Sequence, residues 1–323
     1  MSLKKYVASN FDFDVSGLAS YVDAQRDEIL VKQVTAGRTL EKITIQEGVK
    51  GSEEIKLMDD SIVYQAGDCT MTPSGNTVFT DRALAVETIG YMKKFCQKDL
   101  AGFWTQLNLR AGAMAEDEEL PFEAQIVAYI NSLQSNELDK LIWRGNKTTG
   151  TGNLAFMNGF VSILTTAAGC VNLNTSSTAA ITNANAYDVF YEVFTNTPEA
   201  VAEGTDFVCF TGRENFNKLV KNLVDLNFFH YSPEAIAELN EVTVPGTDMV
   251  VSKCVGLNTM DNIYTGRASH FIFGTDLTGD LDDFQLWYSI DDDVIYMRSK
   301  FRAGVNVPFL DQIGVWNGTS SPT

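Results

Sequence analysis

Apolar and polar residues alternate strictly over two short runs near the start of the chain. Ile43 and Ile45 alternate with polar residues, and Ile55 and Leu57 do the same after a glycine-flanked segment at residues 48–51. Such alternation is typical of a strand with one buried face, so the two runs predict a β-hairpin with a turn at 48–51. A two-stranded hairpin is marginally stable alone in water. Its apolar stripe must therefore pack on the parent domain or on another copy of the protein.

The clearest helix follows further along the chain. Apolar residues recur at roughly helical spacing from Phe122 to Trp143, after four acidic residues at 116–119. Acidic residues suit the positive end of the helix dipole, and Pro121 suits the first turn. Gly145 predicts the end of the helix. A helix over residues 120–143 would be about 35 Å long.

The remaining periodicities predict a mixed α+β fold. A long hairpin is expected between residues 284–290 and 294–301, with three aspartates at its tip, and a last strand after Gly304 at 305–309. Residues 154–171 are apolar but contain Asn, Ser, Thr and glycine, so they predict buried strands and no membrane span. Further strands are predicted at 62–65, 68–72, 79–91, 207–210, 242–251 and 270–273, and further helices at 96–108, 187–194, 215–226 and 233–239.

Charge and cysteine content exclude several classes of protein. The chain has 323 residues, with 42 Asp+Glu against 24 Lys+Arg and a formal net charge of −18, which argues against a protein whose main task is binding nucleic acid. Five cysteines without a CxxC pair, and two histidines, argue against a zinc site and favour a reducing compartment. No apolar run follows Lys4 and Lys5, so no signal peptide is expected. We expect a soluble intracellular protein.

The sequence contains no convincing catalytic or ligand-binding motif. The glycine-rich segment 145–151 lacks the lysine of a phosphate loop and follows a predicted helix, not a strand. Asp276, Asp280, Asp282 and Asp283 lack the spacing of a calcium loop. The sequence also has neither a Gly-x-Ser-x-Gly elbow nor a His-Glu-x-x-His pair. We therefore predict no enzyme, no cofactor and no metal site.

The order of the predicted elements resembles the tailed-bacteriophage major capsid fold of the Hong Kong phage type. Local sequences that contribute are Leu120-Pro121-Phe122, Trp143-Arg144-Gly145 and the apolar run Phe271–Gly274. The resemblance implies an α+β fold with an N-terminal arm, an extended β-hairpin loop, a peripheral domain with a long spine helix, and an axial domain. The implied boundaries are 1–37 for the arm, 38–80 for the extended loop, 81–173 for the peripheral domain with its spine helix at 120–143, 174–282 for the axial domain, 283–302 for a returning peripheral-domain hairpin, and 303–323 for a closing axial-domain strand and tail.

The function that this resemblance implies is assembly. A major capsid subunit would form pentamers and hexamers of an icosahedral shell that encloses a phage double-stranded DNA genome, without sequence-specific binding and without a membrane. The subunit would be made in the host cytoplasm and reside in the virion, with separate scaffold, portal or other virion proteins as further partners. Some relatives crosslink through a lysine of the extended loop, and Lys50 and Lys56 are available. The candidate inter-subunit contact residues are Ile43, Ile45, Lys50, Ile55, Lys56 and Leu57.

Two alternatives remain open at this stage. An encapsulin-like nanocompartment shell protein would have the same fold but would co-purify with cargo enzyme and no genome. An acidic β-rich hydrolase would be monomeric, with carboxylates converging in a cleft. The charge distribution adds a hypothesis about a shell: an acidic lining would repel enclosed DNA. The first 58 residues are nearly neutral, with eight Lys+Arg against nine acids, so this part is expected to contact neighbours.

Overall fold

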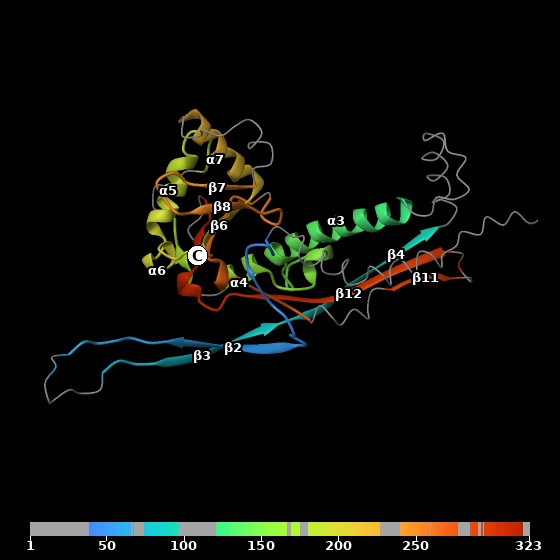
Figure 1. Ribbon diagram of the computed structural model, residues 1–323, viewed down its shortest axis with the longest axis horizontal. Helices are drawn as coiled ribbons and strands as arrows, with labels where there is room; N and C mark the ends of the chain where they lie inside the picture. Colours follow the sequence, from blue (N-terminus) through green and yellow to red (C-terminus); the bar gives the residue numbers. More distant parts are fainter. Residues whose placement is uncertain are drawn as a thin grey trace, which may run out of the picture. The chain divides into compact units, whose positions relative to one another are not determined.

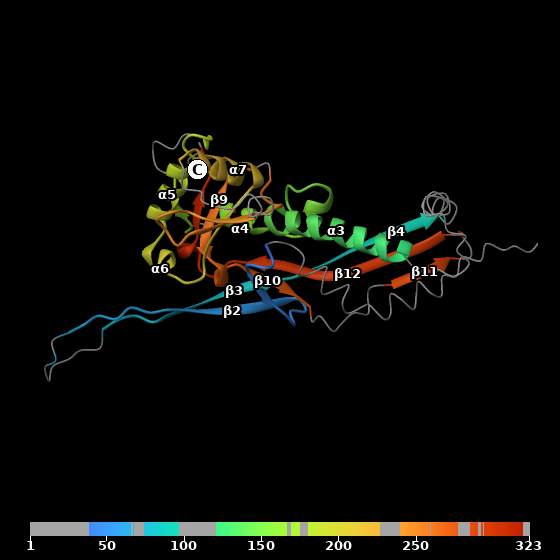
Figure 2. The same ribbon diagram turned by 45° about the horizontal axis from the view of Figure 1, so that its top comes forward.

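The computed structural model confirms a mixed α+β fold, and the chain divides into two compact units (Figures 1 and 2). Unit 1 consists of Met1–Val34, Thr88–Gln134 and Thr278–Phe301, and unit 2 consists of Thr35–Glu87, Ser135–Leu277 and Arg302–Thr323. The structure describes residues 39–65, 67, 74–96, 121–166, 169–174, 180–226, 240–258, 260–276, 285–289, 292 and 294–318. The predicted arm at 1–37, strand at 68–72 and helix at 233–239 lie outside these residues, as does the helix at 96–108 apart from Cys96, which ends a strand.

A six-stranded sheet forms the centre of unit 2. Its strand order is β5-β13-β9-β6-β8-β7, and β6 pairs in parallel with β8 and antiparallel with β9. The strands are β5 Val171–Asn172, β6 Phe207–Thr211, β7 Glu241–Thr243, β8 Val250–Lys253, β9 Ile263–Arg267 and β13 Gly314–Trp316. The strands predicted near 207–210 and 242–251 are thereby confirmed.

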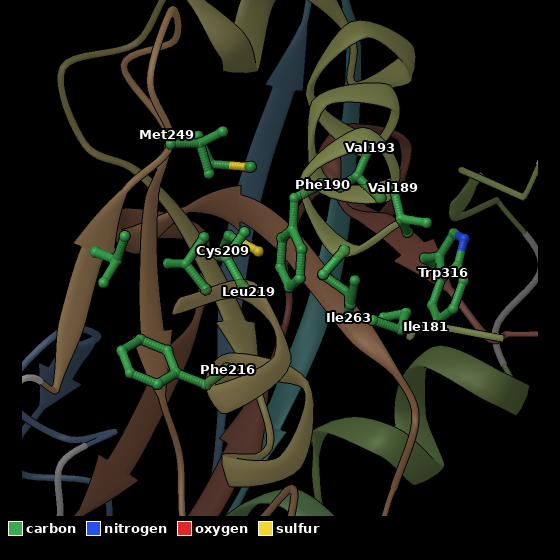
Figure 3. Close-up of a cluster of buried hydrophobic side chains, with 14 of the residues drawn as sticks. Ile181, Val189, Phe190, Val193, Cys209, Phe216, Leu219, Met249, Ile263 and Trp316 are labelled. Atoms are coloured by element: carbon green, nitrogen blue, oxygen red, sulfur yellow. The ribbon is translucent and has the colours of Figure 1, made fainter. Parts of the chain in front are cut away.

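Two amphipathic helices contribute the main helical part of this core. Helix α5 (Ala186–Asn196) and helix α7 (Arg213–Asp225) confirm the helical predictions for these segments, and the short helix α6 (Glu199–Ala202) lies between them in the chain. Figure 3 shows Phe190 of α5 and Leu219 of α7 meeting Cys209 of the central strand. All five residues of β6 are buried, as expected for a continuous apolar strand inside a sheet.

The long helix predicted from the sequence is confirmed as α3, which spans Pro121–Arg144. Gly145 follows it, and its N–H donates to the Leu141 carbonyl at 2.9 Å. Near the end of α3, the fully buried indole of Trp143 packs among aromatic rings from four other segments of unit 2. The ring-centroid distances from Trp143 are 5.3 Å to Phe160, 5.2 Å to Phe210, 5.4 Å to Tyr264 and 6.2 Å to Phe271. This cluster anchors the second half of the helix in unit 2.

A buried carboxylate one turn earlier ties three segments of unit 2 together. Asp139 is 2% exposed and accepts hydrogen bonds from the backbone N–H of Thr39 at 3.3 Å and of Gly256 at 2.9 Å. The Trp143 indole N–H also donates to the Thr39 hydroxyl at 2.8 Å. The start of the described chain is therefore fixed against α3.

The prediction of buried strands over residues 154–171 is wrong. The segment contains a 3-10 helix at Gly152–Ala155 and helix α4 at Phe160–Thr166, and of its described residues only the last, Val171, enters a strand. Phe160 and Leu164 are four residues apart and buried, which gives α4 one apolar face. The Thr166 hydroxyl donates to the Ser162 carbonyl at 2.8 Å, so this polar side chain is accommodated within the helix.

The predicted hairpin between residues 43–46 and 54–57 is also wrong. Strand β1 (Thr44–Gln46) pairs in parallel with β10 (Ile272–Thr275), and β2 (Ser52–Asp59) pairs antiparallel with β3 (Val78–Ala85). The reason lies in the segment that was expected to turn. Val49 is only 1% exposed, and its N–H donates to the Thr275 carbonyl at 3.0 Å. The chain therefore continues beside the end of β10 and does not fold back on β1.

Two further strand predictions need correction. Residues 62–65 are described but form no strand. The expected break at Gly304 does not occur, because β12 runs without interruption from Val294 to Asn306, and the last strand is β13 instead of 305–309. Gly304 is required inside β12 by close backbone approach, since a Cβ at this position would lie 2.2 Å from the Ala85 carbonyl oxygen.

The part of the five-stranded sheet that lies in unit 1 consists of β4 (Glu87–Cys96) from Thr88 onward, β11 (Gln285–Ser289) and the first part of β12, with β12 paired to both other strands. Strands β11 and β12 are antiparallel, with Trp287 opposite Tyr296, which confirms the predicted C-terminal hairpin. Beyond Phe301, β12 continues into unit 2 and pairs with β10.

Candidate functional site

The β2–β3 hairpin is the most prominent exposed feature of unit 2. Figures 1 and 2 show its two strands side by side, extending beyond the compact body of that unit. The register places Leu57 opposite Thr80 and Met58 opposite Phe79. Because side chains alternate along a strand, the Leu57 pair and the Met58 pair lie on opposite faces of the hairpin.

The six predicted contact residues divide between two parts of unit 2. Ile55 and Leu57 lie on one face of the hairpin. Ile45 lies within β1 and Ile43 directly precedes it, in the sheet that also contains β10 and β12. Ile43 and Leu57 are each 8% exposed, and Ile55 packs against a small buried cluster at the base of the hairpin. The members of this cluster are Val49, Leu84, Val86 and Ile272. These aliphatic side chains therefore contribute to the subunit's own packing.

The two lysines among the predicted contact residues lie in a different environment from the four aliphatic residues, because both lysines are exposed to solvent. Lys50 and Lys56 are both exposed, and Lys56 lies opposite Asp81 in the register. Their contact with a neighbouring copy, like that of the four aliphatic residues, stays a prediction. For Ile43 and Leu57 little side-chain area is left for such a contact.

The exposed apolar area of the hairpin lies on residues that sequence reasoning missed. Met58 is 60% exposed and its cross-strand partner Phe79 is 73% exposed, while Tyr64, which follows β2, is 92% exposed. We call this set the hairpin apolar surface; its residues are Met58, Ile62, Val63, Tyr64, Val78 and Phe79, of which Val78, opposite Asp59, lies on the other face from Met58 and Phe79. Large apolar side chains exposed side by side, as Met58 and Phe79 are, mark surfaces that bind another molecule. Since Met58 directly follows Leu57, alternation places it on the opposite, exposed face of the strand, and the sequence could have shown this. The pairing of Met58 with Phe79, however, requires the strand register.

Negative charge surrounds the hairpin apolar surface. The two strands and the residue after β2 carry five carboxylates, Glu53, Glu54, Asp59, Asp60 and Asp81, against two cations, Lys56 and Arg82. Like charges brought together across a sheet edge are destabilising. Two such hairpins therefore repel each other, and a different surface is the more favourable partner for the apolar residues.

Among the described residues, no side-chain group is suited to holding a metal ion, and the glycine-rich segment is not arranged as a phosphate loop. No group of three or more His, Cys, Asp or Glu side chains there could hold a metal ion. The Asn146 carboxamide accepts the N–H groups of Thr148 at 2.8 Å and Thr149 at 2.9 Å, so the glycine-rich segment uses these amides internally. Within the predicted acidic cluster, Asp276 forms an ion pair with Arg302 at 2.7 Å, and the other three aspartates lie outside the described residues. Across the part of the chain that was searched, none of the helices has the length and apolar character needed to cross a membrane.

Comparison with known proteins identifies the fold. No protein-family model and no curated protein matches the sequence. The structure, however, is similar to a chain of the satellite phage P4 procapsid with its size determination (Sid) protein, with a TM-score of 0.60 and 10% identity, covering 92% of this chain and 94% of that chain. It is also similar to the capsid of a native GTA particle, with a TM-score of 0.57, 11% identity and 90% and 91% coverage. A chain of Mycobacterium phage Ogopogo matches at a TM-score of 0.55, with 12% identity and 87% and 91% coverage.

These similarities extend over most of each chain, so they concern the whole architecture and not one shared motif. The chain has the tailed-phage major capsid fold, as the order of its elements predicted. At this level of sequence identity, the likeness defines the fold, and function is argued separately below.

Proposed function

We propose that this chain is a structural, non-catalytic subunit of an icosahedral capsid that encloses phage double-stranded DNA. The observation that carries the proposal is the match along nearly the full length to the P4 procapsid chain, which covers 92% of this chain and 94% of that one. A match that covers more than nine-tenths of both chains leaves little of either chain outside the shared architecture. The same architecture in a procapsid and in a GTA capsid supports a role as a shell subunit.

The hairpin apolar surface is the part of the molecule that we assign to contact with a neighbouring copy. Burying a large apolar side chain fully contributes about 1.5–3 kcal/mol, and Met58 and Phe79 retain most of their area for such a contact. The carboxylates around them disfavour a contact between two hairpins, so the hairpin of one copy meets a different surface on the next. Contacts of this heterologous kind form closed rings when the rotation between copies closes.

The remaining parts of the proposal follow from the resemblance to capsid subunits. Residues 1–37 act as an arm, 38–80 as the extended loop, and the peripheral and axial regions have the boundaries given above. The chain assembles into pentamers and hexamers, resides in the virion after synthesis in the host cytoplasm, and works with separate scaffold, portal or other virion proteins. Lys50 and Lys56 are the residues through which the extended loop could be crosslinked.

The test is assembly of the purified full-length protein, followed by size-exclusion chromatography and electron microscopy. We expect closed shells for the unmodified protein and for the control Phe156→Ser, which alters an exposed aromatic outside the hairpin. The double variant Met58→Ser/Phe79→Ser should stay folded, as judged by circular dichroism, but form few or no shells. Strictly monomeric or dimeric unmodified protein under all assembly conditions would refute the proposed function. Normal shells from the double variant would refute the role of the hairpin.

The contents of the particles separate a capsid from a nanocompartment. Particles isolated from the natural source should contain double-stranded DNA that is protected from added nuclease. Particles that instead contain one co-purifying enzyme and no nucleic acid would favour the nanocompartment shell.

A further inference from the structure

The sheet of unit 1 has a charge opposite to that of the chain as a whole. Its strand segments, 88–96, 285–289 and 294–301, contain Lys93, Lys94, Arg298 and Lys300 but not one aspartate or glutamate. The chain carries 42 acidic residues and a net charge of −18. A sheet with four cations and no carboxylate is therefore an exception to the composition of the molecule.

Three of these cations lie on the same face of the sheet. Tyr296, Arg298 and Lys300 share a face of β12 because side chains alternate along a strand. A Cβ built on Gly90 of β4 would lie 3.0 Å from the Cγ of Lys300, so the two residues are neighbours on this face. Alternation along β4 then places Met92 and Lys94 on the same side as Gly90. We call this surface the basic sheet face: Met92, Lys94, Trp287, Tyr296, Arg298 and Lys300.

The basic sheet face is the solvent side of the sheet. Met92 is 55% exposed, Trp287 is 37% exposed, Lys94 is also exposed, and Arg298 and Lys300 are half-buried. On the opposite side, Ile89 is 8% exposed and Met297 is 2% exposed. The cations are therefore directed away from the packed side of unit 1.

The three cations have no ion-pair partner within the described residues. Elsewhere in that part of the chain cations do pair: Lys147 with Glu87 at 2.6 Å, Lys218 with Glu214 at 2.8 Å and Lys221 with Asp225 at 3.5 Å. Like charges on neighbouring strands repel each other, which costs free energy in the isolated subunit. A polyanion bound to the face would convert that cost into attraction.

An aromatic pair lies on the same face as the cations. Trp287 stacks on Tyr296 with a centroid distance of 5.4 Å and an interplanar angle of 26°. Asp292 is the described carboxylate nearest in sequence to this aromatic pair. It lies in the turn between β11 and β12 and accepts a hydrogen bond from the Tyr296 hydroxyl at 2.9 Å. An exposed ring flanked by cations is the arrangement with which proteins hold a nucleic-acid strand without reading its sequence, since cations contact phosphates and rings stack on bases.

We propose that the basic sheet face binds nucleic acid independently of sequence, with Lys94, Arg298 and Lys300 contacting phosphates and Trp287 stacking on an unpaired base. An acidic protein would satisfy the cations equally well but offers no base to stack on the ring, so nucleic acid fits the whole face better. The inference goes beyond the proposed function and refines the idea of a uniformly repelling acidic wall. It depends on the proposed function only for where the protein meets nucleic acid.

The test uses full-length protein and fluorescein-labelled DNA of about 20 nucleotides, single-stranded or duplex, with binding followed by anisotropy between about 50 and about 200 mM salt. Three phosphate contacts predict a slope of log K against log salt of about −2 for single strands and about −3 for duplex. The variant Lys94→Gln/Arg298→Gln/Lys300→Gln should lose at least about tenfold in affinity and most of the slope. The control Lys147→Gln/Lys218→Gln/Lys221→Gln has the same net charge as this triple variant and should bind DNA as tightly as the unmodified protein. Trp287→Leu should abolish any preference for single strands and retain duplex binding.

Equal affinity of the two triple variants for DNA would overturn the proposal. Displacement of the DNA by poly-glutamate at equal charge concentration would also overturn it and would assign the face to an acidic protein. If the triple variant does not fold, Lys94→Gln alone should lower the salt slope by about one, and an unchanged slope would refute the proposal. Shell formation is recorded separately by electron microscopy. Normal shells without DNA binding refute only this inference, and DNA binding without shells refutes only the proposed function.

Discussion

Replacing Asp139 by alanine removes a buried side chain of α3 that hydrogen-bonds the backbone of two other segments of unit 2. The carboxylate accepts the backbone N–H of Thr39 at 3.3 Å and of Gly256 at 2.9 Å. Both residues are buried, and within the described residues neither amide has another acceptor. Alanine would leave both N–H groups unpaired in the interior.

The magnitude follows from these two amides. An unsatisfied buried donor costs about 1–3 kcal/mol, so Asp139→Ala should lower the free energy of unfolding by about 2–6 kcal/mol. Asp139→Asn keeps one carbonyl oxygen and loses the other acceptor, so it should cost about half as much, about 1–3 kcal/mol. Typical domains are stable by about 5–15 kcal/mol, so the alanine variant would lose a large share of its stability.

The assay is urea unfolding of the unassembled subunit, followed by far-ultraviolet circular dichroism. Asp188→Ala is a suitable control because Asp188 is exposed in the first turn of α5 and should cost no more than about 1 kcal/mol through the helix dipole. The reasoning fails if Asp139→Ala unfolds at the same urea concentration as the unmodified protein. It also fails if the asparagine variant is the less stable of the two.

Two further predictions concern strand packing and pH. Gly304→Ala should lower the free energy of unfolding by about 1–3 kcal/mol because its Cβ would meet the Ala85 carbonyl. The control Gly51→Ala, with nothing near its Cβ, should have little effect. Equal thermal midpoints for the two variants would contradict this. Burial, aided by the charge of Arg267 and opposed by Asp206 and Asp311, lowers the pKa of His270 below its ordinary 6.5. As pH falls, the unfolded chain therefore binds a proton on the imidazole of His270 before the folded protein does. The contribution of neutral His270 to the free energy of unfolding is complete above pH 6.5 and is lost as pH falls through the lowered pKa of the folded state. His270→Gln should flatten the dependence of the urea midpoint on pH in this window, and parallel profiles for the variant and the unmodified protein would contradict the assignment.

Periodicity in the sequence identified most described strands and helices, but apart from the β11–β12 hairpin it did not identify the partners of the strands. The alternation at Ile43 and Ile45 correctly indicated a strand, yet its partner is β10, far along the chain. The alternation at Ile55 and Leu57 likewise indicated β2, whose partner is β3. A period reveals which faces are apolar, whereas pairing depends on tertiary contacts such as the burial of Val49 in the segment taken for a turn.

The candidate site was predictable only in part for the same reason. The sequence directed attention to the hairpin region, and a hairpin with β2 as one strand exists. The side chains chosen there, Ile55 and Leu57, belong to the face that packs at the base, because the apolar stripe that marks a strand also marks its buried side. The exposed pair, Met58 and Phe79, joins residues from two strands, so it became visible only with the register.

The pairing of strands that are distant in sequence sets a time order for folding of the subunit. Strand β1 pairs with β10, and β13 lies between β5 and β9. Because a ribosome adds about 5–20 residues per second, β1 is made many seconds before β10 and has no native partner during that time. Pairing between segments so distant in sequence is also intrinsically slow. The nascent chain therefore exposes the edge of β1 while most of unit 2 is still being synthesised.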